Sequence, residues 1–492
     1  MMVDSFNSSI TSRTRALRGS SALGLLILLA GFAIRLSTAT GLPDTPDAVR
    51  LLNSLETFDL LEFSPQFPGY PLAVAAARSL VAASDAAELG FFLWPGLAWS
   101  WLQIAAATVL APLAVLLCIP ADRPRARLGA LALLVAHPFL ALESLRVGTD
   151  FLALPGIFGA MLLLRQPGGS FRGGVLLGLA LGFRPSLFPW LLALLGAPKK
   201  RAAVAGAAVG ILAWVLPTAA IVGGETWLSE GVRFVGGHFG TWGGSAWTDV
   251  GRESTRLGTA LVNWGLEPLA PAVLPTPIRG ALIVAGVLGV IGLLVGFRRG
   301  GFTFRFGPLF WGVTGYLGWI AVAQHPEHSR HVIPLVPLAL AALIGGFAPS
   351  KDRLAGALGV LLAAALLPCT WGLLGAYHNS IPPAWEAAQA LASDPRFDPL
   401  LDRVYVADDR AYFRSVGPNW SIGTVFSREE LERDLDSLPL PPRCVWVSSQ
   451  IGAGEDRPRP TEESAIIARR DPSLCSYAAE VRIEPHIESE PR

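Results

Sequence analysis

The chain has 492 residues, of which 52% are hydrophobic and only 16% are charged, and its mean hydropathy is +0.47. Soluble proteins of this length do not have such a composition, which is typical of polytopic membrane proteins. The formal net charge is +1, so no basic face indicates a nucleic acid as partner. We expect membrane lipids and lipid-linked substrates as the partners.

The first apolar run covers about residues 20–39 and follows Arg13, Arg15 and Arg18. It has no small-residue cleavage site followed by a soluble domain, so we interpret it as a retained span with residues 1–19 in the cytoplasm. A span needs about 20 residues. Further spans are expected near 91–119, 128–144, 149–164, 202–222, 277–297, 307–323, 332–348 and 354–376.

The placement of arginine and lysine selects the topology, because cytoplasmic loops carry an excess of both. All their clusters lie inside only if Tyr70–Ala83 is a surface helix and Gly173–Gly196 crosses out and back as two short helices broken at Arg184-Pro185. The predicted fold is therefore an α-helical polytopic membrane domain with eleven spans. Its parts are the membrane domain 20–376, the outer loops 41–90, 223–276 and 324–331, and an outer C-terminus.

The C-terminal region 383–492 is polar and shows the signals of a small α/β domain outside the cytoplasm. Strands are expected at Arg403–Ala407 and Cys444–Ser448. Between them, Ser427-Arg-Glu-Glu430 is a capping box that opens a helix to about Leu438.

Beyond these elements, Thr461 is expected to cap a further helix, and a strand is expected near Tyr477–Ile483. If the domain is exported, Cys444 and Cys475 can form a disulfide; the alternative is two thiols.

Two carboxylates, Asp44 and Asp47, follow the first span in a loop punctuated by Pro43 and Pro46. Sugar transfer to a hydroxyl needs a carboxylate that takes the acceptor proton, and a loop beside a rigid helix can hold one in place. The alternative is that Asp44 or Thr45 caps a helix that begins at Pro46. Asp47 is the preferred catalytic candidate, because it begins this helix.

Arg184 lies between two apolar half-spans. An arginine at membrane depth is costly, so it normally faces a cavity and a partner. A phosphate is a suitable partner, because the planar guanidinium group can donate two parallel hydrogen bonds to it. The alternative partner is a membrane-face acid such as Asp150.

The segment Gln324–His331 packs three histidines, an arginine and a glutamate between two spans. Arg330 and His331 are candidates for binding a phosphate, and His325 and His328 for contacting substrate. A metal site formed by these histidines with Glu327 is the alternative, but the spacing matches no zinc signature. No cofactor is required by the sequence, and a divalent metal is not supported by it.

Other substrate-contacting candidates lie in the outer loops and at the outer ends of spans. His238 and Trp242 lie in a stretch rich in glycine and aromatic residues, which suits either sugar faces or an interfacial aromatic belt. Glu143 and Asp150 flank the predicted third and fourth spans. They either position the acceptor and support Arg184, or pair with neighbours such as Arg146.

Four features of the chain, taken in their order, resemble the GT-C superfamily. They are the acidic first outer loop, the turn Phe67-Pro-Gly-Tyr-Pro71, the short spans around Gly182-Phe-Arg-Pro185 and the segment Ser329–Pro337. The likeness is to its bacterial branch, related to protein mannosyltransferases and aminoarabinose transferases. These integral-membrane glycosyltransferases use polyprenyl-phosphate sugars. The resemblance covers about residues 20–376.

The resemblance implies an inverting transfer at the outer face of a bacterial inner membrane, with Asp47 as base and Arg184 and Arg330 on the lipid phosphate. Tyr70 of the turn would belong to the substrate loop. The chain has Asp47-Ala where family members often have Asp-Glu, so the choice between Asp44 and Asp47 stays open.

The expected activity is therefore that of a hexosyltransferase or mannosyltransferase, with a lipid, glycan or protein as acceptor. The alternative function is a secondary transporter or lipid flippase, which also uses broken helices and intramembrane arginines. Such transporters usually contain two related halves, and the sequence has no such repeat. A polysaccharide polymerase or ligase belongs to the same chemical class.

Overall fold

The structure is a computed structural model of the chain, and its described residues form two compact units. One unit is Met1–Gly41 with Phe58–Gly375, and the other is Leu42–Thr57 with Ala376–Arg492. The described residues are 21–86, 95–240, 245–246, 248, 253–298, 307–347, 352–406, 410–417, 419–425, 427–437, 444–448, 451, 465–469, 474 and 480–486.

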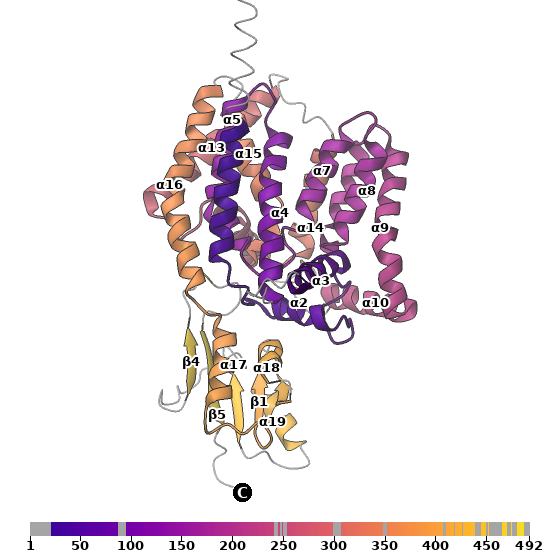
Figure 1. The fold of residues 1–492 in the computed structure, drawn as a ribbon, viewed down its shortest axis with the longest axis vertical. Helices are drawn as coiled ribbons and strands as arrows, with labels where there is room; N and C mark the ends of the chain where they lie inside the picture. Colours follow the sequence, from indigo (N-terminus) through magenta and orange to yellow (C-terminus); the bar gives the residue numbers. More distant parts are fainter. Residues whose placement is uncertain are drawn as a thin grey trace, which may run out of the picture. The chain divides into compact units, whose positions relative to one another are not determined.

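The first unit is helical (Figure 1). Its elements in chain order are Ser21–Thr38, α3 (Pro71–Ala86), α4 (Pro95–Cys118), α5 (Pro124–Ala136), α6 (Pro138–Glu143), α7 (Leu154–Leu164), α8 (Ser170–Leu181), η1 (Pro185–Gly196), α9 (Lys200–Val222), α10 (Gly224–Gly240), α11 (Glu253–Ala260), η2 (Leu261–Leu266), α12 (Glu267–Leu269), α13 (Thr276–Arg298), α14 (Pro308–Ala323), η3 (Ser329–Val332), α15 (Val336–Phe347) and α16 (Asp352–His378).

Several of these helices have the length and apolar composition of membrane spans. Helix Ser21–Thr38, α4, α9 and α16 are long enough to cross a bilayer, and six of the described helices are shorter and apolar. The chain is therefore an integral membrane protein. The eleven-span arrangement stays a prediction.

Two of the expected spans are interrupted at X-Pro steps. The predicted break at Arg184-Pro185 is confirmed: α8 ends at Leu181, η1 begins at Pro185, and Arg184 between them is not helical, with φ −152° and ψ 87°. The run 128–144 was expected to be one helix and is two, α5 and α6, separated at His137. Proline lacks the N–H of a continuous helix and keeps the preceding residue extended.

Small residues bring neighbouring helices of this unit into backbone contact. Figure 1 shows α7, α8 and α9 side by side. A Cβ added at Gly178 of α8 would collide with the carbonyl oxygen of Ala207 in α9, and one added at Gly210 would collide with that of Val175. Within a bilayer such close approach supplies the van der Waals contact that the hydrophobic effect does not.

The second unit contains a five-stranded sheet. The strand order is β2-β1-β3-β5-β4, in which β1 is parallel to β2 and β3, and β5 is antiparallel to β3 and β4. Its elements are α2 (Pro46–Glu56), α17 (Pro383–Ser393), β1 (Arg403–Val406), α18 (Arg410–Val416), β2 (Ser421–Thr424), α19 (Arg428–Asp436), β3 (Val445–Ser448), β4 (Ile466–Arg469) and β5 (Glu480–His486).

The sheet confirms the strands expected near 403, 444 and 477, and Ser427 caps α19 by accepting a hydrogen bond from the backbone N–H of Glu430. Strands β2 and β4 and helices α17 and α18 were not predicted. The expected cap at Thr461 and Cys475, the expected disulfide partner of Cys444, lie outside the described residues.

Helix α2 belongs to this second unit although it lies more than 300 residues before α17 in the chain. Thr45 caps the helix by accepting a hydrogen bond from Ala48 N, and Pro46 occupies its first turn. Val49 is fully buried in a core with Val404, Phe413 and other apolar side chains of the C-terminal region. Helix α2 therefore completes the core of the C-terminal domain.

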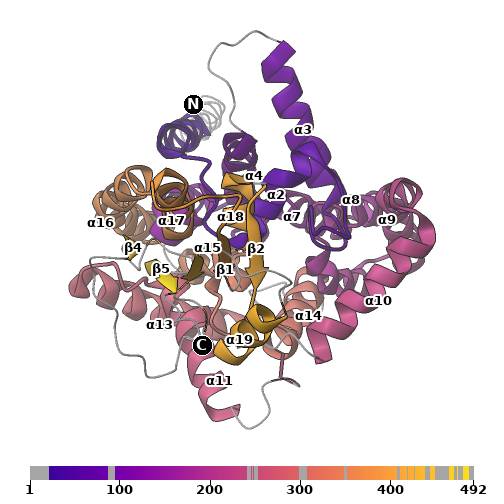
Figure 2. The same ribbon diagram turned by 90° about the horizontal axis from the view of Figure 1, so that it is seen from below.

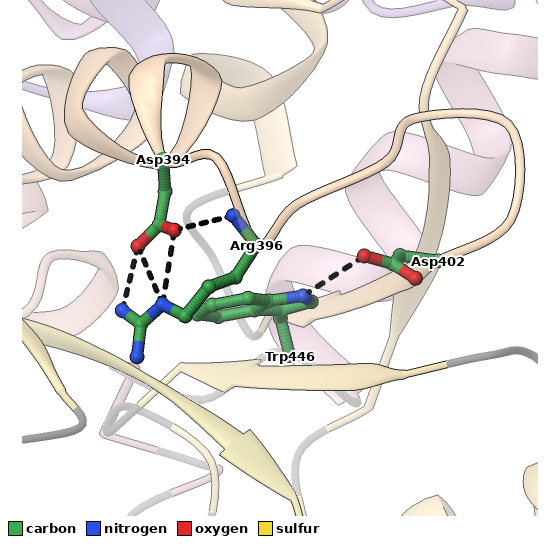
Figure 3. Close-up of polar contacts among 4 residues, drawn as sticks. All are labelled: Asp394, Arg396, Asp402 and Trp446. Atoms are coloured by element: carbon green, nitrogen blue, oxygen red, sulfur yellow. Dashed lines mark hydrogen bonds and ion pairs between the residues drawn. The ribbon is translucent and has the colours of Figure 1, made fainter.

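A polar cluster fixes the connection between α17 and β1 (Figure 3). The Arg396 guanidinium donates to both carboxylate oxygens of Asp394, at 2.6 and 3.0 Å, and lies 5.4 Å from the ring centroid of Trp446. The Trp446 indole donates to Asp402 at 3.3 Å. The hydrogen bonds from Arg396 hold the pKa of Asp394 below its ordinary value.

Candidate functional site

Arg184 is held at the break between α8 and η1 by two polar contacts. Its Nη2 lies 2.8 Å from Asp150 Oδ1, and its Nη1 donates to Thr149 Oγ1 at 2.8 Å. The Arg184 and Asp150 side chains are 16% and 15% exposed. The salt bridge considered as an alternative is therefore present. Arginine has five N–H donors, so further donors of Arg184 remain to bind a phosphate beside Asp150 and Thr149.

Gln103 of α4 supports this segment and was not identified from the sequence. Its Oε1 accepts from Phe151 N at 2.8 Å, while its buried Nε2 has no hydrogen-bond partner among the described residues. A Cβ at Gly148 would lie 3.1 Å from Asp150 Oδ2 and 3.2 Å from Gln103 Nε2. The absence of a side chain at position 148 thus leaves room for both the amide and the carboxylate beside this backbone. An isolated glutamine in an apolar span was the available signal.

His331 lies in η3, at the end of the histidine-rich segment, and the charge of Arg184 acts on it. Tyr316 donates a hydrogen bond to the backbone oxygen of His331 at 2.7 Å. Burial, and then the charges of Arg330, His328 and Arg184, hold the pKa of His331 well below 6.5. The structure therefore brings the three predicted phosphate-binding residues, Arg184, Arg330 and His331, within electrostatic range of one another.

The other two histidines of this segment continue the cluster. The ring centroids of His325 and His328 are 5.3 Å apart, and those of His328 and His331 are 5.8 Å apart. His325 Nδ1 lies 3.9 Å from Glu327 Oε2. Within the described part of the chain, no group of three or more His, Cys, Asp and Glu side chains is arranged to hold a metal ion.

The predicted outer loop 223–276 is largely helical, and its helices hold the histidine-rich segment. Figure 2 shows α10 leading from the end of α9 toward α14. His238 Nε2 lies 2.7 Å from the backbone oxygen of Ala323. Arg256 of α11 donates to Gln324 O at 2.7 Å. Trp242 lies outside the described residues.

The turn that contains Tyr70 is anchored beside the helix break. Leu72 N donates to Gly182 O at 3.1 Å, and Gln66 Nε2 donates to the Tyr70 hydroxyl at 3.1 Å. The Phe67 ring centroid lies 5.3 Å from that of Trp227 in α10. The turn therefore contacts both α10 and the residue two positions before Arg184.

Glu143 forms the pair that was considered as its alternative role. Its Oε1 lies 2.7 Å from Arg146 Nη1, and both side chains are largely buried.

Asp44 and Asp47 belong to the second unit, and their surroundings differ. Asp44 is buried and accepts a hydrogen bond from the Tyr377 hydroxyl at 2.9 Å. The Asp47 side chain is 31% exposed, lies in the first turn of α2 and is 3.3 Å from Arg50. Thr45 caps α2, so neither aspartate is needed for that role. Asp47 is the more accessible of the two carboxylates, because Asp44 is buried.

Comparisons with known proteins give structural matches only. No protein-family model matches the sequence, and no curated protein matches it significantly. The structure is similar to ArnT from Cupriavidus metallidurans bound to undecaprenyl phosphate, with a TM-score of 0.53 and 13% identity over 96% of this chain and 99% of that chain.

Two further structural matches score lower. ArnT from the same organism in the apo state has a TM-score of 0.46 and 14% identity over 97% of this chain and 100% of that chain. The Archaeoglobus fulgidus oligosaccharyltransferase in complex with Zn and sulfate has a TM-score of 0.42 and 16% identity over 80% and 62%. Only the first match carries weight, and at 13% identity it establishes the fold.

Proposed function

We propose that this chain, whose fold is that of the GT-C superfamily, is a glycosyltransferase. It transfers a sugar from a polyprenyl-phosphate-linked donor to an acceptor at the outer face of a bacterial inner membrane. The observation that carries the proposal is that Arg184, at the break between α8 and η1, and Arg330 both lie within electrostatic range of His331.

The cluster has the chemistry of a phosphate site. The two guanidinium groups offer charge-assisted donors to a phosphate, and backbone broken at membrane depth is tolerable where it lines a site. A structure with the same fold was determined with undecaprenyl phosphate bound. In our proposal, Arg184 and Arg330 hold the donor phosphate and stabilise the charge that develops on it as the sugar leaves.

Asp47 is the proposed base, because Asp44 is buried against Tyr377 and Asp47 is partly exposed. The acceptor oxygen attacks the anomeric carbon from the side opposite the phosphate, so the configuration inverts. The bond from that carbon to the phosphate oxygen breaks, polyprenyl phosphate leaves with the bonding electrons, and the acceptor proton passes to the Asp47 carboxylate.

The first experiment compares wild type with Asp47→Asn in transfer from a panel of radiolabelled polyprenyl-phosphate sugars to a crude envelope extract. We expect loss of about 10²–10⁴-fold in transfer, the usual contribution of a general base, with donor binding unchanged. Asp436→Asn is the control, because it removes an exposed carboxylate from the same unit. Wild-type turnover in Asp47→Asn would refute the assignment of the base.

The same assay distinguishes the alternative functions. Donor binding without transfer by the wild type would indicate a lipid flippase, and absence of donor binding would indicate a transporter of another substrate. Either result would overturn the glycosyltransferase proposal.

A further inference from the structure

A groove of about 300 Å³ lies among helix Ser21–Thr38, α5 and α16. Its walls are apolar and include Ile34, Leu367 and Trp371. Leu367 is 49% exposed and Trp371 is 58% exposed, so the groove opens on the surface of the helical unit. In an integral membrane protein, this apolar surface is available to lipid.

Arg35 is the one charged side chain among the described residues that line the groove. The residue is 4% exposed. Its Nη2 donates to the backbone oxygen of Val135 at 2.9 Å, while its buried Nε has no hydrogen-bond partner among the residues that the structure describes. Within the described parts of the chain no carboxylate forms an ion pair with it. A buried cation in this state is costly unless an anion completes its surroundings.

The Arg35 guanidinium reaches back along its helix, because its Nη1 would lie 3.7 Å from a Cβ at Gly31, which also lines the groove. Arg35 lies one turn before the end of helix Ser21–Thr38, whereas Ile27 lines the groove two turns earlier. The helix packs tightly there, because a Cβ at Gly31 would collide with the side chain of Val135. A buried positive charge beside an apolar groove matches an amphiphile with an anionic headgroup and a hydrocarbon chain.

We propose that this groove binds an anionic membrane lipid, whose phosphate contacts Arg35 and whose acyl chain lies along the walls formed by α5 and α16. The guanidinium complements the charge of the headgroup, and the apolar walls complement the chain. The inference concerns a lipid site apart from Arg184 and does not depend on the proposed sugar transfer.

Fluorescence quenching tests the proposal, because Trp371 lines the groove. The full-length protein is placed in phosphatidylcholine bilayers that contain a small fraction of brominated phosphatidylglycerol or brominated phosphatidylcholine. The difference between wild type and Trp371→Phe isolates the quenching of this one indole. We expect about fivefold stronger quenching by the anionic lipid, the preference that one arginine gives at a membrane surface.

Two kinds of variant separate the charge from the groove. Arg35→Met removes the charge and keeps an apolar stem, so we expect the preference to disappear while neutral lipid still quenches. Ala30→Phe with Ala364→Phe fills the groove and keeps Arg35, so quenching by both lipids falls. The matched controls are Arg172→Met, an exposed charge, and Val209→Phe, an exposed apolar site on α9; neither should change the preference.

The outcomes decide the proposal in each case. A preference that persists in Arg35→Met, or falls equally in Arg172→Met or Val209→Phe, would overturn it. Loss of the preference on adding inorganic phosphate at constant ionic strength would assign the site to free phosphate and also overturn it. If Arg35→Met does not fold, the filled-groove variant decides, since a retained preference there contradicts the proposal.

Discussion

At the scale of single residues, Tyr377 distinguishes the two acids of the first outer loop. Its hydroxyl donates to the buried Asp44 carboxylate, so Asp44 is bonded within the second unit. We predict that Tyr377→Phe lowers the free energy of unfolding by about 1–3 kcal/mol, because a buried carboxylate loses a donor.

Thermal unfolding of the full-length protein measures this effect. Transfer per folded molecule should stay near the wild-type value in Tyr377→Phe. A catalytic loss as large as that of Asp47→Asn, without loss of stability, would instead place Asp44 in the reaction.

The second residue-scale prediction concerns pH. Burial and neighbouring positive charges hold the pKa of His331 well below 6.5. Below about pH 6.5 the unfolded chain therefore binds a proton at this histidine that the folded chain does not, so the free energy of unfolding falls as the pH falls. We predict a smaller loss of stability between pH 7.5 and 5.5 in His331→Gln than in the wild type.

Unfolding midpoints of both proteins at the two pH values provide the measurement, and His378→Gln is the control at another histidine. Equal losses in wild type and His331→Gln would show that His331 does not carry the acid sensitivity.

At the scale of elements, the contact between α8 and α9 depends on glycine. A Cβ at Gly178 would collide with the backbone of Ala207, whereas one at Gly372 in α16 meets no atom within 4 Å. We predict that Gly178→Ala lowers the free energy of unfolding by about 1–3 kcal/mol through overpacking. Gly372→Ala should be neutral or stabilising, because alanine favours the helix. Denaturation in detergent compares them, and equal effects would refute the close-packing explanation.

The same scale shows which elements the sequence could predict. The break at Arg184-Pro185 followed from proline chemistry and from charge placement, and it is confirmed. The His137-Pro138 step carried the same signal but lay within one apolar run, so hydropathy outweighed it. Strands β2 and β4 have four residues each, and segments this short have no resolvable periodicity.

At the scale of the whole molecule, the order of weak motifs predicted a fold resembling that of aminoarabinose transferases, and the structure is similar in fold to ArnT from Cupriavidus metallidurans. The electrostatic proximity of Arg184 to His331 could not be predicted, because it results from the packing of η1 against α14, whose Tyr316 donates to the backbone oxygen of His331. Gln103 was missed for the same reason, since its role depends on a backbone bend at Gly148 and Phe151.

The association of α2 with the C-terminal domain was also not predictable, and it changes what that domain is expected to do. The sequence placed no candidate site residue in 383–492. The helix that begins with Asp47 nevertheless has its buried residue Val49 in the core of that domain. The domain therefore supports the helix that carries the proposed base.

We predict that Val49→Asp removes this support, because a carboxylate in an apolar core without a partner is strongly unfavourable. Transfer should fall by at least about tenfold, since a misplaced base loses its alignment with the acceptor, while donor binding by the membrane unit persists. Leu400→Asp is the control, because it places the same carboxylate at an exposed position of the same unit. If Val49→Asp retains full transfer, then α2 does not need the C-terminal core to position Asp47, and the domain is dispensable for the reaction.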